Sequence, residues 1–170
     1  MLAGQAVSEP ASYPAPPPGV FPDFNHFTTS DIAAYTKTNW HHDTYIAFKT
    51  SGGVTCFSYI YGQTTGVDGL GLIECTSRNM PGFPENAGGQ QGRGTTPGER
   101  SIQSVRENSD GSFEFAYTNA EAVSDDPPVL PAGKRLVVNN SGCGAGDDFV
   151  ACYTAYHHGF VVSPTGSWAF

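Results

Sequence analysis

Residues 44–61 read TYIAFKT-SGG-VTCFSYIY, two runs of β-branched and aromatic residues separated by a Ser-Gly-Gly break. Such runs are typical of β-strands, and a short glycine-containing break between them is typical of a hairpin. In the second run Phe57 and Tyr59 alternate with Cys, Ser and Ile, as expected for a strand with two different faces. This stretch therefore predicts two antiparallel strands, at residues 44–50 and 54–61.

The pattern of strands and turns continues to the end of the chain. Asp110-Gly111 is a tight-turn signal, and the residues after it alternate between aromatic and small or polar. A capping residue followed by helix formers at 29–35 predicts one or two helical turns. Further strands are expected at residues 70–76, 101–106, 112–118, 135–139, 149–155, 159–163 and 167–170. The spacing predicts a mainly β fold, a small antiparallel sandwich or barrel-like domain with at most one short helix.

The four cysteines are Cys56, Cys75, Cys143 and Cys152. An even number in a small, turn-rich chain indicates disulfides formed in an oxidising compartment. Of the three possible pairings we favour Cys56–Cys75 and Cys143–Cys152, because each pair flanks a glycine-rich turn between two strand-like runs. Cys-x-x-Cys spacing does not occur, which argues against a zinc site, and we expect neither a metal nor a cofactor.

Charge and composition limit the partners. The net charge is −8, so a nucleic-acid backbone or an anionic lipid surface is an unsuitable partner. Charged residues make up only 14% of the chain, while 21 glycines and 13 prolines fit many turns. Since no apolar stretch approaches the ~20 residues that span a bilayer, we expect no transmembrane segment.

Proline and small residues dominate the first 25 positions. Such a composition favours extended, unpacked chain, so we expect a flexible tail at 1–25 and a single disulfide-linked β domain at 26–170. Leu2-Ala3-Gly4 has the form of a bacterial lipobox, but Gln5 stands where the lipidated cysteine belongs. We favour a cleaved signal peptide before a secreted or cell-envelope chain, with a lipoprotein as the alternative.

Five motifs follow one another in the order of a known pattern: AFKTSGGVTC at 47–56, MPGFPENA at 80–87, LPAGKRL at 130–136, the pair Cys143 and Cys152, and GFVVSPTGSW at 159–168. Together they resemble a family of secreted proteins and lipoproteins from mycobacteria and related actinobacteria. That family carries F-x-T-P-S/D-G-x-x-C near its first cysteine and G-F-x-L-S-x-x-G-S-W at its end. The likeness spans residues 44–170, although Ser51 stands where proline is common.

This resemblance implies export, two local disulfides and a β-rich domain. It implies no assigned reaction and supplies no catalytic residues. The sequence itself contains no G-x-S-x-G, H-E-x-x-H, Walker or G-x-G-x-x-G signature in a suitable context, so we expect no catalytic site.

Aromatic residues and histidines are the candidates for binding. The candidate binding residues are Trp40, Tyr45, His158 and Trp168. Aromatic side chains such as these can line a groove for a sugar or an acyl chain, although most aromatic side chains belong to a core. The histidine pairs at 41–42 and 157–158 have two interpretations, a metal site completed by aspartate or locally hydrogen-bonded surface residues, and we favour the second.

The function most consistent with these features is a non-catalytic secreted or cell-envelope binding protein, whose partner is an envelope protein or a glycolipid. Residues 77–100, a long Gly/Pro-rich loop, are the expected place for contacts. The first alternative is a cell-envelope hydrolase in which Ser or Asp lies beside His158 or His42. The second is a purely structural or antigenic surface protein.

Overall fold

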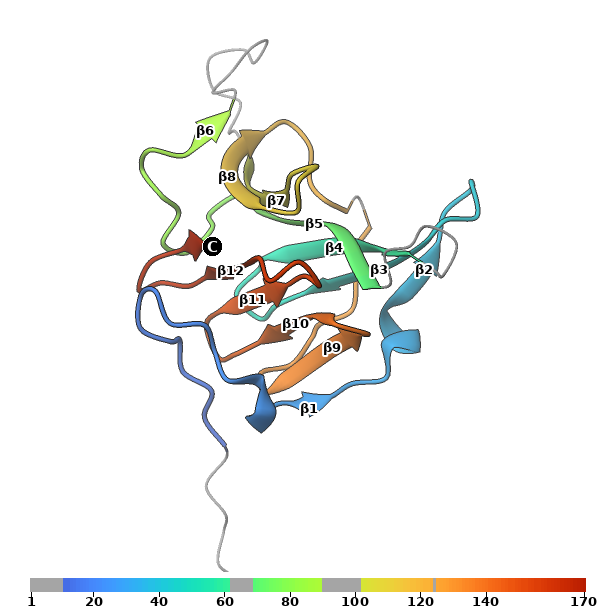
Figure 1. The fold of residues 1–170 in the computed structure, drawn as a ribbon, viewed down its shortest axis with the longest axis horizontal. Coiled ribbons are helices and arrows are strands. Elements are labelled where there is room, and N and C mark those ends of the chain that lie inside the picture. The colour runs from blue at the N-terminus through green and yellow to red at the C-terminus, as the bar shows by residue number, and fades with distance from the viewer. Residues whose placement is uncertain (1–10, 62–68, 90–101, 124) are drawn as a thin grey trace, which may run out of the picture.

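The computed structural model describes residues 11–61, 69–89, 102–123 and 125–170. Two β-sheets lie one above the other, as Figure 1 shows, and the main apolar core fills the space between them. The prediction of a mainly β fold with two local disulfides is confirmed.

Sheet A has six strands in the spatial order β1 (Thr28–Thr29), β9 (Lys134–Val138), β10 (Ser141–Ala145), β11 (Val150–Tyr153), β12 (Gly159–Val162) and β13 (Trp168–Ala169). Sheet B has seven, in the order β2 (Thr36–Thr38), β3 (Thr44–Lys49), β4 (Thr55–Tyr61), β5 (Gly69–Ser77), β7 (Ile102–Glu107), β8 (Phe113–Thr118) and β6 (Gly88–Gly89). Among the strand pairs of the described residues, β1–β9 and β6–β8 are parallel and the others are antiparallel.

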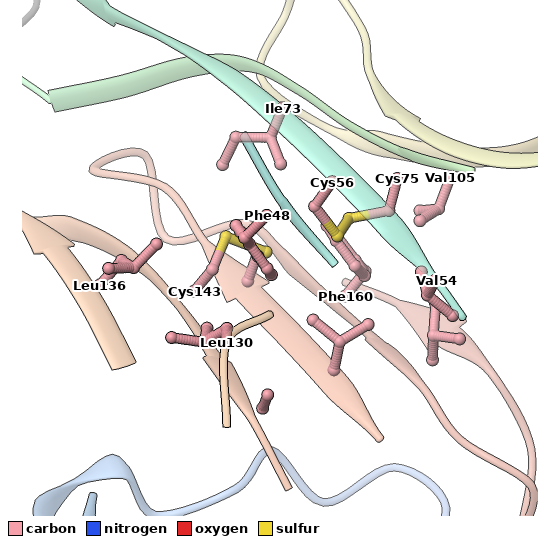
Figure 2. Close-up of a cluster of buried hydrophobic side chains, with 14 of the residues drawn as sticks. Phe48, Val54, Cys56, Ile73, Cys75, Val105, Leu130, Leu136, Cys143 and Phe160 are labelled. Atoms are coloured by element: carbon pink, nitrogen blue, oxygen red, sulfur yellow. A yellow bond between two sulfur atoms is a disulfide. The ribbon is translucent and has the colours of Figure 1, made fainter. Parts of the chain in front are cut away.

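Each predicted disulfide joins two directly opposite residues of neighbouring antiparallel strands. Cys56 of β4 faces Cys75 of β5, and Cys143 of β10 faces Cys152 of β11. All four half-cystines are at most 1% exposed and belong to one apolar core. Figure 2 shows both sulfur bridges among side chains that include Phe48 of sheet B.

The sequence prediction missed β10, which reads SGCGA. Two glycines in five residues are unfavourable for a strand, and no alternation of apolar and polar residues reveals it. The strand forms because it is entirely buried and is hydrogen-bonded on both sides, to β9 and to β11.

Helical structure is limited, in the residues placed by the structure, to two 3-10 turns, η1 (Phe24–His26) and η2 (Ile32–Tyr35). The expected helix at 29–35 is thus a single turn, η2. It begins at Asp31, whose carboxylate accepts a hydrogen bond from the amide of Ala33 at 3.0 Å. No helix within these ranges is both long and apolar enough to cross a membrane.

Residues 11–23 run along the outer face of sheet A, at the N-terminal end of the coloured chain in Figure 1, and we call them the N-terminal strap. A flexible tail was expected over 1–25, whereas Tyr13 and Phe21 of the strap pack on the sheet. The carboxylate of Asp147 accepts hydrogen bonds from the Ser12 hydroxyl and the Tyr13 amide, at 3.0 and 2.8 Å. Aromatic side chains spaced among the prolines supply the apolar surface that a proline-rich segment ordinarily lacks.

The long loop expected at 77–100 is only partly described, because residues 90–101 lie outside the placed ranges. Its first half is packed: Met80 is 3% exposed, and its amide donates to the side chain of Gln103. The Ser167 hydroxyl donates to the carbonyl of Pro81 at 2.6 Å, which joins this half of the loop to the C-terminal turn.

Burial of both disulfides leads to a testable expectation. A reductant at neutral pH should leave the bridges intact in the folded protein, since an attacking thiolate cannot reach buried sulfur. Thiol titration should then detect four cysteines only after urea unfolds the chain. Replacing Cys56 and Cys75 by serine should lower the free energy of unfolding by about 3.3 kcal/mol, and replacing Cys143 and Cys152 by about 2.7 kcal/mol. Rapid thiol labelling while circular dichroism remains native would contradict this expectation.

Candidate functional site

The outer face of sheet A carries a second apolar cluster, separate from the core between the sheets. Its buried members are Phe24, Phe27, Phe149, Ala151 and Val161. Partly buried side chains complete it, and these come from the strap and from the sheet: Tyr13, Ala15, Phe21, Tyr153 and Trp168. This outer face is therefore mostly covered, and a surface hollow remains where the cluster meets the turns of the sheet.

Glycines of β10 make room for the aromatic rings of this cluster. A Cβ atom on Gly144 would lie 2.6 Å from the ring of Phe24, and one on Gly142 would lie 3.2 Å from the ring of Tyr153. Both contacts are tighter than carbon atoms tolerate without displacement. The glycines that make β10 hard to recognise as a strand in the sequence thus allow Phe24 and Tyr153 to lie close against the sheet.

The hollow is a pocket of about 770 Å³, and we call it the Arg135 pocket. It lies beside the β9–β10 and β11–β12 turns, and the strap and η1 form its opposite wall. It has both aromatic and polar lining residues, which include Phe21, Tyr153, Phe170, Arg135, Asn139 and Asn140. A volume of roughly 300–1,000 Å³, apolar walls and a few polar groups are typical of sites for small ligands.

Two charged residues line this pocket, Asp23, whose carboxylate lies 3.4 Å from Nε2 of His26, and Arg135, which is held in place by two hydrogen bonds. Its Nε donates to the Thr29 hydroxyl at 3.0 Å, and its Nη1 donates to the carbonyl of Phe24 at 2.9 Å. No carboxylate within the placed ranges lies close enough to form an ion pair with it. A guanidinium has five N–H donors, so further donors remain for a ligand in the pocket. Because two protein acceptors already hold the group, little side-chain entropy is lost on binding.

The wall formed by the N-terminal segment is held by ring contacts. The Phe21 ring lies 5.4 Å from that of Phe24, 6.2 Å from that of Tyr153 and 5.5 Å from that of Phe170, measured between centroids, in edge-to-face arrangements. Such contacts are favourable beyond the burial of area alone. A segment expected to be unpacked thus forms one side of the pocket.

The structure places two of the predicted binding residues near this pocket but not in its lining. Trp168 pairs with Val161 in the β12–β13 ladder and packs into the outer cluster, its ring 5.3 Å from that of Phe170. Nδ1 of His158 lies 3.1 Å from the carbonyl oxygen of Phe170. The neighbouring His157, the other member of that histidine pair, lines the pocket.

The other two candidates lie on sheet B, in the β2–β3 hairpin. Trp40, 82% exposed, stands at the tip beside the ring of His41. Hydrogen bonds define the turn at this tip: the side chain of Asn39 accepts from the amides of His41 and Asp43, both at 2.9 Å. Tyr45 lines a separate groove on the outer face of sheet B. The four candidates therefore belong to two different places.

Serine, histidine and acidic side chains are the groups from which a catalytic or metal-binding arrangement would be built. In the placed part of the chain no serine hydroxyl is hydrogen-bonded to a histidine ring, and His158 contacts a main-chain carbonyl instead. No three His, Cys, Asp or Glu side chains of these ranges gather in a way that would hold a metal ion. The Asp147 carboxylate accepts hydrogen bonds from Ser12 and Tyr13 and so holds the strap.

Glu107 is the one carboxyl whose surroundings raise its pKa in the described ranges. Burial raises the pKa of Glu107, and hydrogen bonds from the amides of Ile73 and Leu72 oppose this effect in part. These amides belong to a bulge in β5, where the register with β4 shifts and Leu72 has a φ of 52°. Left-handed backbone is unfavourable for leucine, so the carboxylate stabilises a strained position. The pKa of the nearby Asp110 is lowered by hydrogen bonds from the hydroxyl and then the amide of Ser112.

The chain matches no protein-family model, and comparison with curated proteins and with solved structures likewise finds no match. The site must therefore be interpreted from its own geometry.

The raised pKa of Glu107 predicts a pH dependence of stability. Between the ordinary value of 4.5 and the raised value, the folded protein binds more protons than the unfolded chain, so the free energy of unfolding falls as pH rises through this interval. Glu107→Gln should remove that decrease. Urea unfolding at several pH values between about 4 and 7 measures it.

Glu85→Gln is the matched control, because Glu85 is an exposed residue of the segment between β5 and β6 whose carboxylate has no ion pair within the described residues. Its pH profile should follow that of the wild type. Identical pH profiles for the wild type and Glu107→Gln would contradict the assignment.

Proposed function

We propose that this protein is a non-catalytic binding module of the extracytoplasmic space, and that the Arg135 pocket binds a neutral or singly acidic saccharide. The observation that carries this proposal is an arginine that has no ion pair within the described residues and that lines the pocket together with the aromatic residues Phe21, Tyr153 and Phe170. Two cross-strand disulfides support a location outside the reducing cytoplasm. A cell-envelope glycan or glycolipid would present such a saccharide.

The chemistry of the pocket suits a sugar ring. The apolar C–H face of a pyranose packs on aromatic rings, which Tyr153 and Phe170 supply. Its hydroxyl groups both donate and accept hydrogen bonds, matching the side-chain amides of Asn139 and Asn140. A ring oxygen, a hydroxyl or a single carboxylate accepts from Arg135. The net charge of −8 repels polyanions at a distance, so a heavily sulfated or phosphorylated glycan is unsuitable.

Arg135→Lys tests this proposal. Lysine retains the charge but not the planar fork of donors, so affinity for a bound saccharide should fall about tenfold, the loss of one charge-assisted hydrogen bond. Binding of the whole chain to an array of neutral and uronic-acid-containing oligosaccharides identifies the ligand. Calorimetry with that ligand then compares the variants.

Arg78→Lys is the matched control, because Arg78 is an exposed arginine of the other sheet, paired with Glu121. Asn140→Ala, in the exposed β9–β10 turn, tests the same pocket without removing the hydrogen bonds that Arg135 makes to Thr29 and Phe24. Absence of binding to every saccharide on the array would overturn the proposal. Equal affinity of the wild type, Arg135→Lys and Asn140→Ala would do the same.

A further inference from the structure

The outer face of sheet B carries a second hollow, a groove of about 400 Å³ that we call the Tyr45 groove. Its floor is formed by side chains of β3, β4 and β5. The segment after β8 forms one wall, from Ala120 to Val123 and at Asp125. Two contacts hold this wall against the sheet: the Ala122 amide donates to the Thr76 hydroxyl at 2.9 Å, and the carboxylate of Asp126 binds Lys49.

Three half-buried aromatic rings lie on the floor of the groove. Tyr45 and Tyr59 are directly opposite in the β3–β4 register, and Phe57 is two residues from Tyr59, so all three side chains share one face of the sheet. The ring centroids of Tyr45 and Phe57 are 5.1 Å apart with planes inclined by 45°. Those of Phe57 and Tyr59 are 4.8 Å apart and inclined by 84°. The groove is thus bordered by ring surfaces that face in different directions.

The charged lining of the groove is entirely acidic: it contains Glu74, Glu121 and Asp125 and no lysine or arginine. Two of these carboxylates have cationic partners just outside the lining, Arg78 for Glu121 and Lys37 for Asp125. Glu74 differs. Its carboxylate accepts from the Ser104 hydroxyl at 2.9 Å and has no ion pair among the placed residues.

The position of Glu74 connects the charge with the rings. Glu74 lies directly opposite Phe57 in the β4–β5 register. On its other side it faces Arg106 of β7, but that guanidinium forms its ion pair with Glu114, at 2.7 Å. An available carboxylate therefore stands beside the aromatic floor of the groove.

We propose that the Tyr45 groove binds a small organic ammonium cation. The negative faces of aromatic rings attract cations, and quaternary ammonium groups are recognised by several rings with different orientations. The adjacent Glu74 carboxylate adds an opposite charge. An anion would be repelled by the carboxylates of the lining, and an uncharged ligand would lack the charge–charge attraction to them.

Titration with choline, followed by amide chemical shifts of the whole chain, tests this proposal. The uncharged isostere 3,3-dimethylbutan-1-ol has the same shape and serves as the reference ligand. Choline should shift the amides of β3, β4 and β5 and should bind about tenfold more tightly than the isostere, since only the cation gains the attraction of rings and carboxylate. Equal affinities for the two compounds, shifts confined to other parts of the chain, or no binding of choline would overturn the proposal.

Two variants assign the roles within the groove. Tyr45→Leu keeps an apolar side chain but removes a ring, and Glu74→Gln removes the charge; each should weaken choline binding about five- to tenfold and leave the isostere unaffected. Tyr156→Leu is the control, because Tyr156 is 53% exposed in the β11–β12 turn of the other sheet. Unchanged choline affinity in both groove variants would contradict the proposal, and thermal unfolding verifies that each variant is folded. Saccharide binding by the Arg135 pocket can succeed or fail independently, since that pocket lies on sheet A.

Discussion

The fold depends on apolar packing between two sheets that are each cross-linked internally. Cys56–Cys75 joins two strands of sheet B and Cys143–Cys152 joins two strands of sheet A, so neither bridge connects the sheets. Closure of the sandwich relies on side chains that meet in the middle, among them Phe48 and Phe160, both at most 1% exposed. A polar contact assists at one edge, where the Leu70 amide of β5 donates to the Ser141 hydroxyl of β10. Covalent bonds thus hold each layer together, and the hydrophobic effect holds the layers to each other.

Both disulfides lie in the interior, and each sheet carries a separate hollow on its outer face. The two hollows differ. Sheet A presents glycines on β10, over which aromatic rings of the N-terminal segment lie, and its remaining hollow contains a fixed arginine. Sheet B presents three aromatic rings of its own strands beside carboxylates. The same architecture therefore offers a cationic donor on one side and an acidic aromatic surface on the other.

Much of this fold could be predicted from the sequence where local signals and tertiary environment agree. The Ser-Gly-Gly break at 51–53 lies between β3 and β4, and the Asp110-Gly111 turn precedes β8, as predicted. The cysteine pairing was predicted from glycine-rich stretches elsewhere, between Cys56 and Cys75 and between Cys143 and Cys152. By contrast, β10 could not be found, because its strand geometry is imposed by neighbours on both sides and its glycines argue locally for a turn.

Most of the residues that form the two candidate sites could not be predicted from the sequence, and the reason is physical. Residue type alone selected the candidates Trp40, Tyr45, His158 and Trp168. Strand register decides which of these side chains lie on the same surface, and register is not visible in the sequence. The importance of Arg135 arises from contacts with Thr29 and with the Phe24 carbonyl, more than a hundred residues away in the chain. No local pattern contains that information.

The N-terminal strap also determines what happens when the chain is shortened. A protein beginning at residue 26 would lack Tyr13 and Phe21 and would leave apolar side chains of the outer cluster, such as Phe149, facing water. An uncovered aromatic surface of this kind favours association between molecules. Proteolytic trimming at the proline-rich end would thus expose an adhesive apolar surface on sheet A, while both disulfides lie in the core away from the cut.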